Sequence, residues 1–118
     1  MLGKFLMTIV IPGTLAAPVD FKTTIPSPCT IQHLSMVQSN AGAGRIKIGT
    51  SADDDAYLAY TTAGISGTPV VLSALSDWIG SVRPHLSKDE VFAVYVDHDG
   101  DGGTAADDLT MVLTFTEG

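Results

Sequence analysis

The sequence predicts an all-β protein: an antiparallel, jelly-roll-like β-sandwich with about eight short strands and at most one short helix. Three observations lead to this prediction. Several segments alternate apolar and polar residues with period two, turn residues recur at short intervals, and no long helical pattern or βαβ alternation is present. The 118 residues fit a single domain, residues 1–118, that can bury one core without disulfide or metal support.

The two clearest strands lie near the end of the chain. Residues 91–96 form a continuous run of apolar β-forming residues, and residues 109–116 alternate between an apolar face and a face of three threonines and Val112. In the second segment one face carries Leu109, Met111, Leu113 and Phe115, while the opposite face is rich in threonine. A threonine-rich strand face suits a sheet surface that is exposed or that faces a partner.

The same signals predict the earlier strands. Near the start, Phe5, Met7, Ile9 and Ile11 share one face, and the Pro-Gly pair at 12–13 ends the strand. Further strands are predicted by the same criteria over residues 21–25, 29–38, 45–48, 57–62 and 68–72.

One segment departs from the strand pattern. Leu75, Trp78, Ile79 and Val82 have i, i+3, i+4, i+7 spacing, which is typical of an amphipathic helix, and Pro84 would end it. A short helix and a loop or irregular strand are equally supported here. Trp78, the only tryptophan, is predicted to be a core or covering residue.

Charge and composition exclude several classes of function. The net charge of −7 argues against nucleic-acid binding and against an anionic membrane surface. Only 16% of the residues are charged, against about 25% in a typical chain, which fits a surface that partners partly cover. The lone Cys29 cannot form an intramolecular disulfide and is predicted to be buried.

The start of the chain is interpreted as a strand, although Lys4 and the apolar run after it superficially match a signal peptide. Alternation and the turn at 12–13 favour the strand. No apolar stretch approaches the length of about 20 residues that spans a membrane. We therefore expect synthesis in a cytoplasm, with Met1 and Leu2 retained, no signal peptide and no transmembrane segment.

The strongest local motif is the acidic, glycine-rich loop 97–108. Asp97, Asp99, Asp101 and Asp108 occupy the first, third, fifth and twelfth places of a calcium-binding loop, with glycine at the sixth. The loop joins two strands, however, whereas an EF-hand loop joins two helices, and the twelfth residue is Asp where Glu is usual. Two interpretations stay open: a Ca²⁺ or other cation site, or a solvated hairpin loop. No cofactor is predicted to be required.

No other motif predicts catalysis. The acidic run 53–55 is interpreted as a solvated loop tip, because consecutive carboxylates in an extended chain point to alternate sides. The alternative is that the run approaches the 97–108 loop in the fold and completes a cation site. His33, His85 and His98 do not have metal-ligand spacing, and no nucleophile elbow or phosphate-binding loop is present. The chain is therefore predicted not to be an enzyme.

Several stretches resemble small β-sandwich virion accessory proteins of tailed phages. They are Ile-Pro-Gly-Thr at 11–14, Ile-Pro-Ser-Pro-Cys-Thr-Ile at 25–31, Ile-Gly-Thr-Ser-Ala-Asp at 48–53, and the whole ending from Val94 to Gly118. The resemblance covers most of the chain in order. It implies a head decoration or cement protein that binds the outside of the capsid, with the major capsid protein and copies of itself as partners, a trimer being the expected arrangement.

The chain departs from that group in one respect, and two other functions remain as alternatives. Decoration proteins often carry an extended arm, whereas here the first strand begins almost at once. The first alternative is a carbohydrate-binding-module-like sandwich on a phage spike or fibre, although Tyr57 and Tyr60 are spaced to face opposite sides of a strand. The second alternative is a small calcium-dependent or hydrolytic protein.

Overall fold

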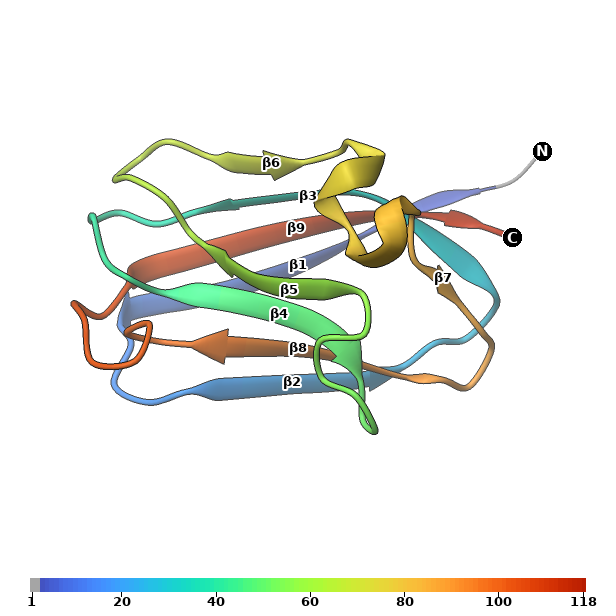
Figure 1. Cartoon of the computed structure of the whole chain (residues 1–118), viewed down its shortest axis with the longest axis horizontal. Helices are drawn as coiled ribbons and strands as arrows, with labels where there is room; N and C mark the ends of the chain where they lie inside the picture. The colour runs from blue at the N-terminus through green and yellow to red at the C-terminus, as the bar shows by residue number, and fades with distance from the viewer. Residues whose placement is uncertain (1–2) are drawn as a thin grey trace.

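The structure of the protein, a computed structural model, describes residues 3–118 as two antiparallel sheets packed face to face (Figure 1). One sheet has the order β1 (Lys4–Thr14), β9 (Asp107–Glu117), β3 (Cys29–Val37) and β6 (Val70–Leu72), with β7 (His85–Leu86) also paired to β3. The other has the order β2 (Val19–Thr24), β8 (Val91–Asp97), β4 (Arg45–Thr50) and β5 (Leu58–Thr62). Met1 and Leu2, on which the expectation of an unprocessed start depends, lie outside the described residues.

The strand pairing is nested, as in a jelly roll. The first strand pairs with the last, β2 pairs with β8, and β3 pairs with both β9 and β6. The predicted all-β sandwich is therefore confirmed. Over residues 3–118, the structure has one strand more than the eight predicted, namely β7. It has two residues and pairs with the start of β3, where Leu86 lies opposite Cys29. It was missed in the sequence because two residues show no periodicity.

The predicted alternation sets the register of the longest pair. Phe5 lies opposite Phe115, Met7 opposite Leu113 and Ile9 opposite Met111, so the apolar residues of β1 and β9 share the inner face. Phe115 is fully buried and stacks on Phe5 with ring centroids 4.9 Å apart. Its other side meets Phe92 of the opposite sheet edge-on at 5.9 Å. Phe115 therefore joins the two layers of the sandwich.

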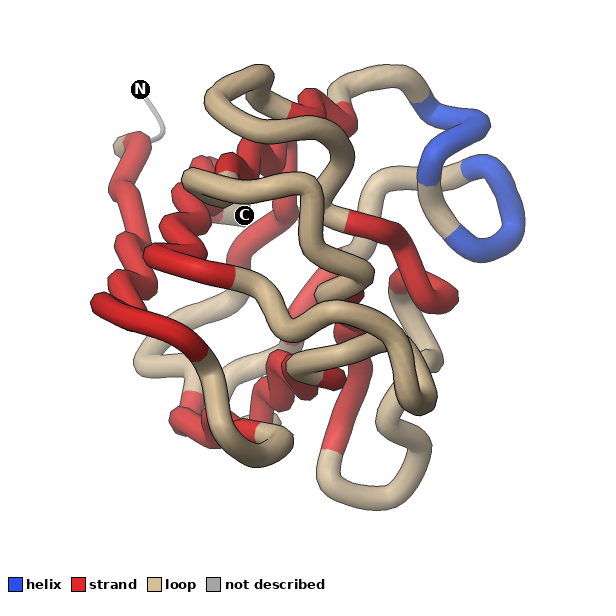
Figure 2. Tube along the Cα trace, turned by 90° about the vertical axis from the view of Figure 1, so that its left-hand side faces the viewer, coloured by secondary structure: helices blue, strands red, loops and turns tan. Residues whose placement is uncertain are grey.

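The segment with helical spacing forms two short 3-10 turns, η1 (Leu75–Asp77) and η2 (Ile79–Ser81), in place of one amphipathic helix. Gly80, with φ of 74°, interrupts any continuous helix. Trp78 is buried in the core, as predicted, while Leu75, Ile79 and Val82 are exposed. The turns project from one side of the sandwich, opposite the strand that follows the N-terminus (Figure 2). No helix within residues 3–118 is long and apolar enough to cross a membrane.

Two further side chains have environments that bear on chemistry. Cys29 is fully buried, as predicted, and burial followed by the nearby charge of Glu90 raises the pKa of its thiol, which disfavours the reactive thiolate. The Tyr57 hydroxyl donates a hydrogen bond to the carboxylate of Glu90 and so ties the segment before β5 to the start of β8. Burial, then this bond, raises the pKa of Tyr57 well above its ordinary value.

Replacement of the aromatic link between the layers should be costly. We expect Phe115→Ala to lower the free energy of unfolding by about 3–5 kcal/mol, because it leaves a cavity between Phe5 and Phe92. Urea denaturation followed by tryptophan fluorescence measures this loss. The control Ile65→Ala, at a side chain that is 67% exposed, should change stability by less than about 0.5 kcal/mol. Equal losses in the two variants would contradict the assigned role of Phe115.

The Tyr57–Glu90 bond should give an alkaline pH dependence. Because the folded pKa of Tyr57 lies above the unfolded value of 10.0, the bond contributes its full stability below that pH and loses it as the pH rises further. We expect Tyr57→Phe to cost about 1–2 kcal/mol at neutral pH, and the difference from the wild type to narrow at alkaline pH. Urea denaturation of both proteins, from neutral pH to alkaline pH above 10.0, measures the difference in the free energy of unfolding. A constant difference would show that the hydroxyl proton is not involved.

Candidate functional site

The acidic loop leaves β8 at Asp97 and returns at β9, where the sequence predicted four cation ligands. Asp101, Gly100 and Gly102 all have positive φ, so the loop tip turns sharply. The Asp101 amide donates to the side chain of Asp99 at 3.1 Å. The tip thus has the Asp-Gly turn chemistry that the hairpin interpretation expects.

At the base of the loop, Asp97 is held by an ion pair. Nε of Arg45 on β4 donates to its carboxylate at 2.9 Å. Burial by itself would raise the pKa of Asp97, but the hydrogen bond and charge of Arg45, helped by bonds from Asp99, lower it overall. His98 places Nε2 at 3.5 Å from the Asp99 carboxylate. One potential ligand atom from each of Asp97, His98 and Asp99 lies within 4.8 Å of the others.

Asp108 has a different environment from the other predicted ligands. Its carboxylate accepts bonds from the Gly13 amide at 2.6 Å and from the Ser39 hydroxyl at 2.9 Å. These bonds, in that order, lower its pKa. They tie β9 to the end of β1 and to the residues after β3. The structure therefore brings together Asp97, His98 and Asp99. It uses Asp108 instead to link β9 to the end of β1 and to the residues after β3. Cation binding by the loop stays a prediction.

The second acidic run, residues 53–55, is exposed, as expected of a loop tip. Asp54 lies 3.0 Å from the ammonium group of Lys47. The ligand atoms of the three carboxylates also fall within 4.8 Å of one another. They form a group of their own, separate from that of the 97–108 loop in the clusters found among residues 3–118.

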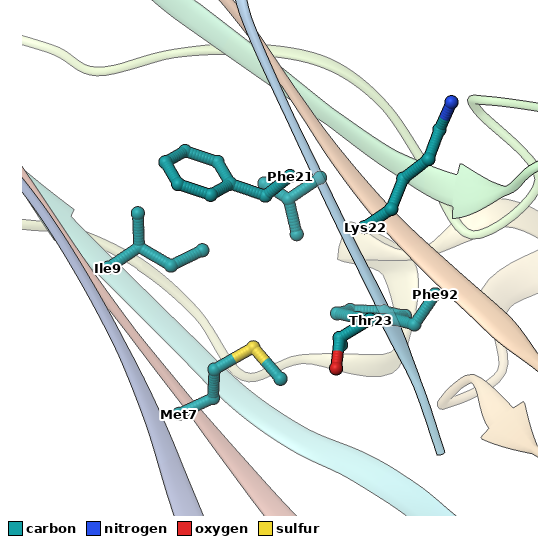
Figure 3. Close-up of a pocket in the computed structure, with 7 residues that line it drawn as sticks. Met7, Ile9, Phe21, Lys22, Thr23 and Phe92 are labelled. Carbon is teal, nitrogen blue, oxygen red and sulfur yellow. The ribbon is translucent and has the colours of Figure 1, made fainter.

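An apolar cavity of about 240 Å³ lies at the side of the sandwich where the two sheets part, between their edge strands β1 and β2. In Figure 3, Met7 and Ile9 extend from β1 and lie across from Phe21 and Thr23 of β2. The complete lining consists of Met7, Ile9, Phe21, Lys22, Thr23, Phe92 and Val94. This lining offers apolar contact and supplies no acid–base pair, so the cavity is suited to binding an apolar group.

A cationic and aromatic patch covers the outer face of the β2-β8-β4-β5 sheet; we define it as Arg45, Lys47, Tyr60 and Tyr95. The Arg45 guanidinium lies 3.9 Å from the centroid of the Tyr60 ring, and the Lys47 ammonium lies 4.6 Å from the same centroid. Tyr95 approaches Tyr60 edge-on at 6.5 Å. Sequence reasoning missed this patch, because the three strands that supply it come together only in the folded sheet. One signal was available in the sequence: successive side chains of a strand point to opposite faces, so Tyr95 lies on the other face of the strand from Val94 and Val96.

Comparison with known proteins gives a likeness in fold. No family model and no curated protein matches the chain. One chain of a solved structure described as the cyanophage Pam1 capsid asymmetric unit is similar, with a TM-score of 0.57 and 9% sequence identity. The match covers 99% of this chain and 85% of that one. At this identity the likeness concerns the fold, which the two chains share over nearly their whole lengths.

Metal dependence can be measured directly. We expect EDTA to leave the melting temperature unchanged, because Arg45 already neutralises Asp97 and Asp108 already has two donors. A loss of stability on chelation would show that the fold requires a metal. An increase in melting temperature with Ca²⁺, absent in Asp99→Asn, would establish the 97–108 loop as a cation site.

Proposed function

We propose that this protein is a non-enzymatic structural component of a phage virion, a decoration or cement protein that binds the outside of the capsid and stabilises it. One observation carries the proposal: 99% of the chain shares its fold with a chain of a cyanophage capsid asymmetric unit. The phage-like stretches of the sequence support the same role. The protein would be made in the host cytoplasm and would reside on the capsid surface, with the major capsid protein and further copies of itself as partners.

The cationic and aromatic patch is the surface that we assign to the shell. Tyrosine and arginine are enriched at the energetic centres of protein interfaces. Three of the six Lys and Arg residues, Lys22, Arg45 and Lys47, lie on this one sheet of a chain whose net charge is −7. Each of the three is paired with a carboxylate, of Asp20, Asp97 and Asp54 respectively, so this sheet is close to neutral and would meet a partner without the repulsion expected from the net charge of the chain.

The surfaces described above also favour binding over catalysis. The side cavity is apolar, the patch offers aromatic and cationic contacts, and the carboxylate of Asp97 is engaged by Arg45. None of these places pairs a nucleophile with a base. The trimer expected at the threefold positions of a shell stays a prediction.

Loss of the central aromatic of the patch should weaken shell binding. We expect Tyr60→Ala to reduce the affinity for assembled shells of the same phage by about tenfold or more, because it removes a ring that is 40% exposed and carries two cations. Co-sedimentation of the purified protein with shells that lack it measures the affinity. The melting temperature of the shells should rise when the wild-type protein binds.

The matched control is Ile65→Ala, which truncates an exposed side chain outside the patch and should leave binding unchanged. If the wild-type protein stays free of shells at micromolar concentration, the proposed function is wrong. If both variants bind as the wild type does, the shell contacts another surface.

The alternative function, glycan binding on a spike or fibre, has one observation in its favour. Tyr60 and Tyr95 lie together on one sheet face, as aromatic side chains do in sugar-binding sandwiches. However, Arg45 and Lys47 already lie over the ring of Tyr60, where a sugar would stack. A glycan array separates the two functions: specific binding that Tyr60→Ala abolishes would favour this alternative.

A further inference from the structure

The outer edge of β1 has few of the features that normally protect an edge strand. β1 is paired on one side only, with β9, and it forms the margin of its sheet (Figure 2). Edge strands are usually short, charged or interrupted by proline or bulges, because a long apolar edge attracts another strand. β1 has 11 residues, and its only charge is Lys4. Pro12 and the irregularity in register come only after Ile11, so residues 5–11 present an uncharged edge.

Apolar groups surround this edge on both faces of the strand. On the outer face Leu6 is 66% exposed and Val10 is 61% exposed. On the inner face Met7 and Ile9 line the side cavity of about 240 Å³ (Figure 3). A cavity of about 150 Å³ can hold benzene, so this space is large enough for an apolar side chain from a neighbouring strand.

The charges along the edge select the direction of that neighbouring strand. Lys4 marks the start of β1, and Glu117 of β9 lies beside Gly3 at the same end. At the far end lies the exposed Asp108 of β9, bonded to the amide of Gly13. In an antiparallel pair of two β1 strands, Lys4 of each copy would approach Asp108 of the other. A parallel pair would instead bring the Asp108 carboxylates of the two copies to the same end, with no cation beside them. The edge is therefore complementary to its own antiparallel copy.

We infer that β1 is a homodimer interface, at which the β1 strands of two copies pair antiparallel across a two-fold axis near Thr8. This register places Leu6 opposite Val10 of the second copy, on the outer face, and Met7 opposite Ile9, on the inner face. Each copy then covers the open side of the other's cavity. The two sheets join into one, as in other cases of strand addition, and the symmetry closes the assembly at two copies.

The distribution of charge explains why two acidic chains would meet here. Each copy has a net charge of −7, so association elsewhere brings carboxylates together. Many of the acidic residues lie in loops, including residues 53–55, Asp99 and Asp101. The edge from Phe5 to Ile11 has none. The inference does not depend on the proposed role in a capsid, and its two-fold pair differs from the expected trimer.

Sedimentation equilibrium of the purified protein from micromolar to millimolar concentration tests the inference. We expect a reversible monomer–dimer equilibrium that Val10→Lys weakens by about tenfold or more, since the new charge would face Leu6 of the second copy. The matched control is Val82→Lys, at a side chain that is 60% exposed and near η2, which should leave the dimer unchanged. A monomer at every concentration, a trimer, or equal weakening by both variants would overturn the inference.

A cysteine at the axis tests the register. Directly opposed residues of antiparallel strands have Cα atoms about 4.5–5.5 Å apart, which is within the range of a disulfide. Under mild oxidation, Thr8→Cys should therefore form a covalent dimer rapidly. The control Thr62→Cys, an exposed position on the edge strand β5, should not, and the native Cys29 is fully buried. Equal rates of cross-linking in the two variants would overturn the proposed pairing.

Discussion

The pairing of the first strand with the last is the constraint on which the rest of the structure depends. β1 and β9 are each 11 residues long, and their register brings Phe5 onto Phe115. Phe115 in turn reaches Phe92 across the sandwich. The remaining strands nest inside this pair: β2 pairs with β8, β3 with β6 and β4 with β5. Because such contacts are distant in sequence, closing the β1–β9 pair carries a large entropic cost in folding.

Contacts with the turn at 40–44 also position the acidic loop. β9 begins beside the turn at 40–44, and this turn packs closely on the loop: Asn40 donates to the Ala105 carbonyl at 2.8 Å, and the Ala43 amide donates to Thr104 at 2.7 Å. A Cβ on Gly42 would lie 2.7 Å from the Ala105 carbonyl oxygen, so only glycine fits there. Backbone packing and hydrogen bonds thus place the carboxylates, and a bound cation would add to a loop that is already held.

The sequence predicts the features that depend on neighbouring residues better than the features that depend on residues far apart in the chain. Strands with period two, such as residues 109–116, were recognisable because alternation is local and their inner face is buried. The segment around Trp78 was ambiguous, since one buried tryptophan among exposed Leu75 and Ile79 mimics a helical pattern. The bonds from Asp108 to Gly13 and Ser39, and the contact between Tyr60 and Tyr95, join residues distant in the chain. The sequence around each of these residues does not identify its partner.

The two inferred interfaces occupy different parts of the sandwich, and this separation has a functional consequence. The cationic and aromatic patch lies on the β2-β8-β4-β5 sheet, while the β1 edge belongs to the other sheet. A protein that used both would present two copies of the patch from one dimer. Two linked sites bind a repetitive surface far more tightly than one, provided that their spacing matches the repeat. Weak contacts of a single patch would then be sufficient for firm attachment to a shell, because a shell is a regular array of identical sites.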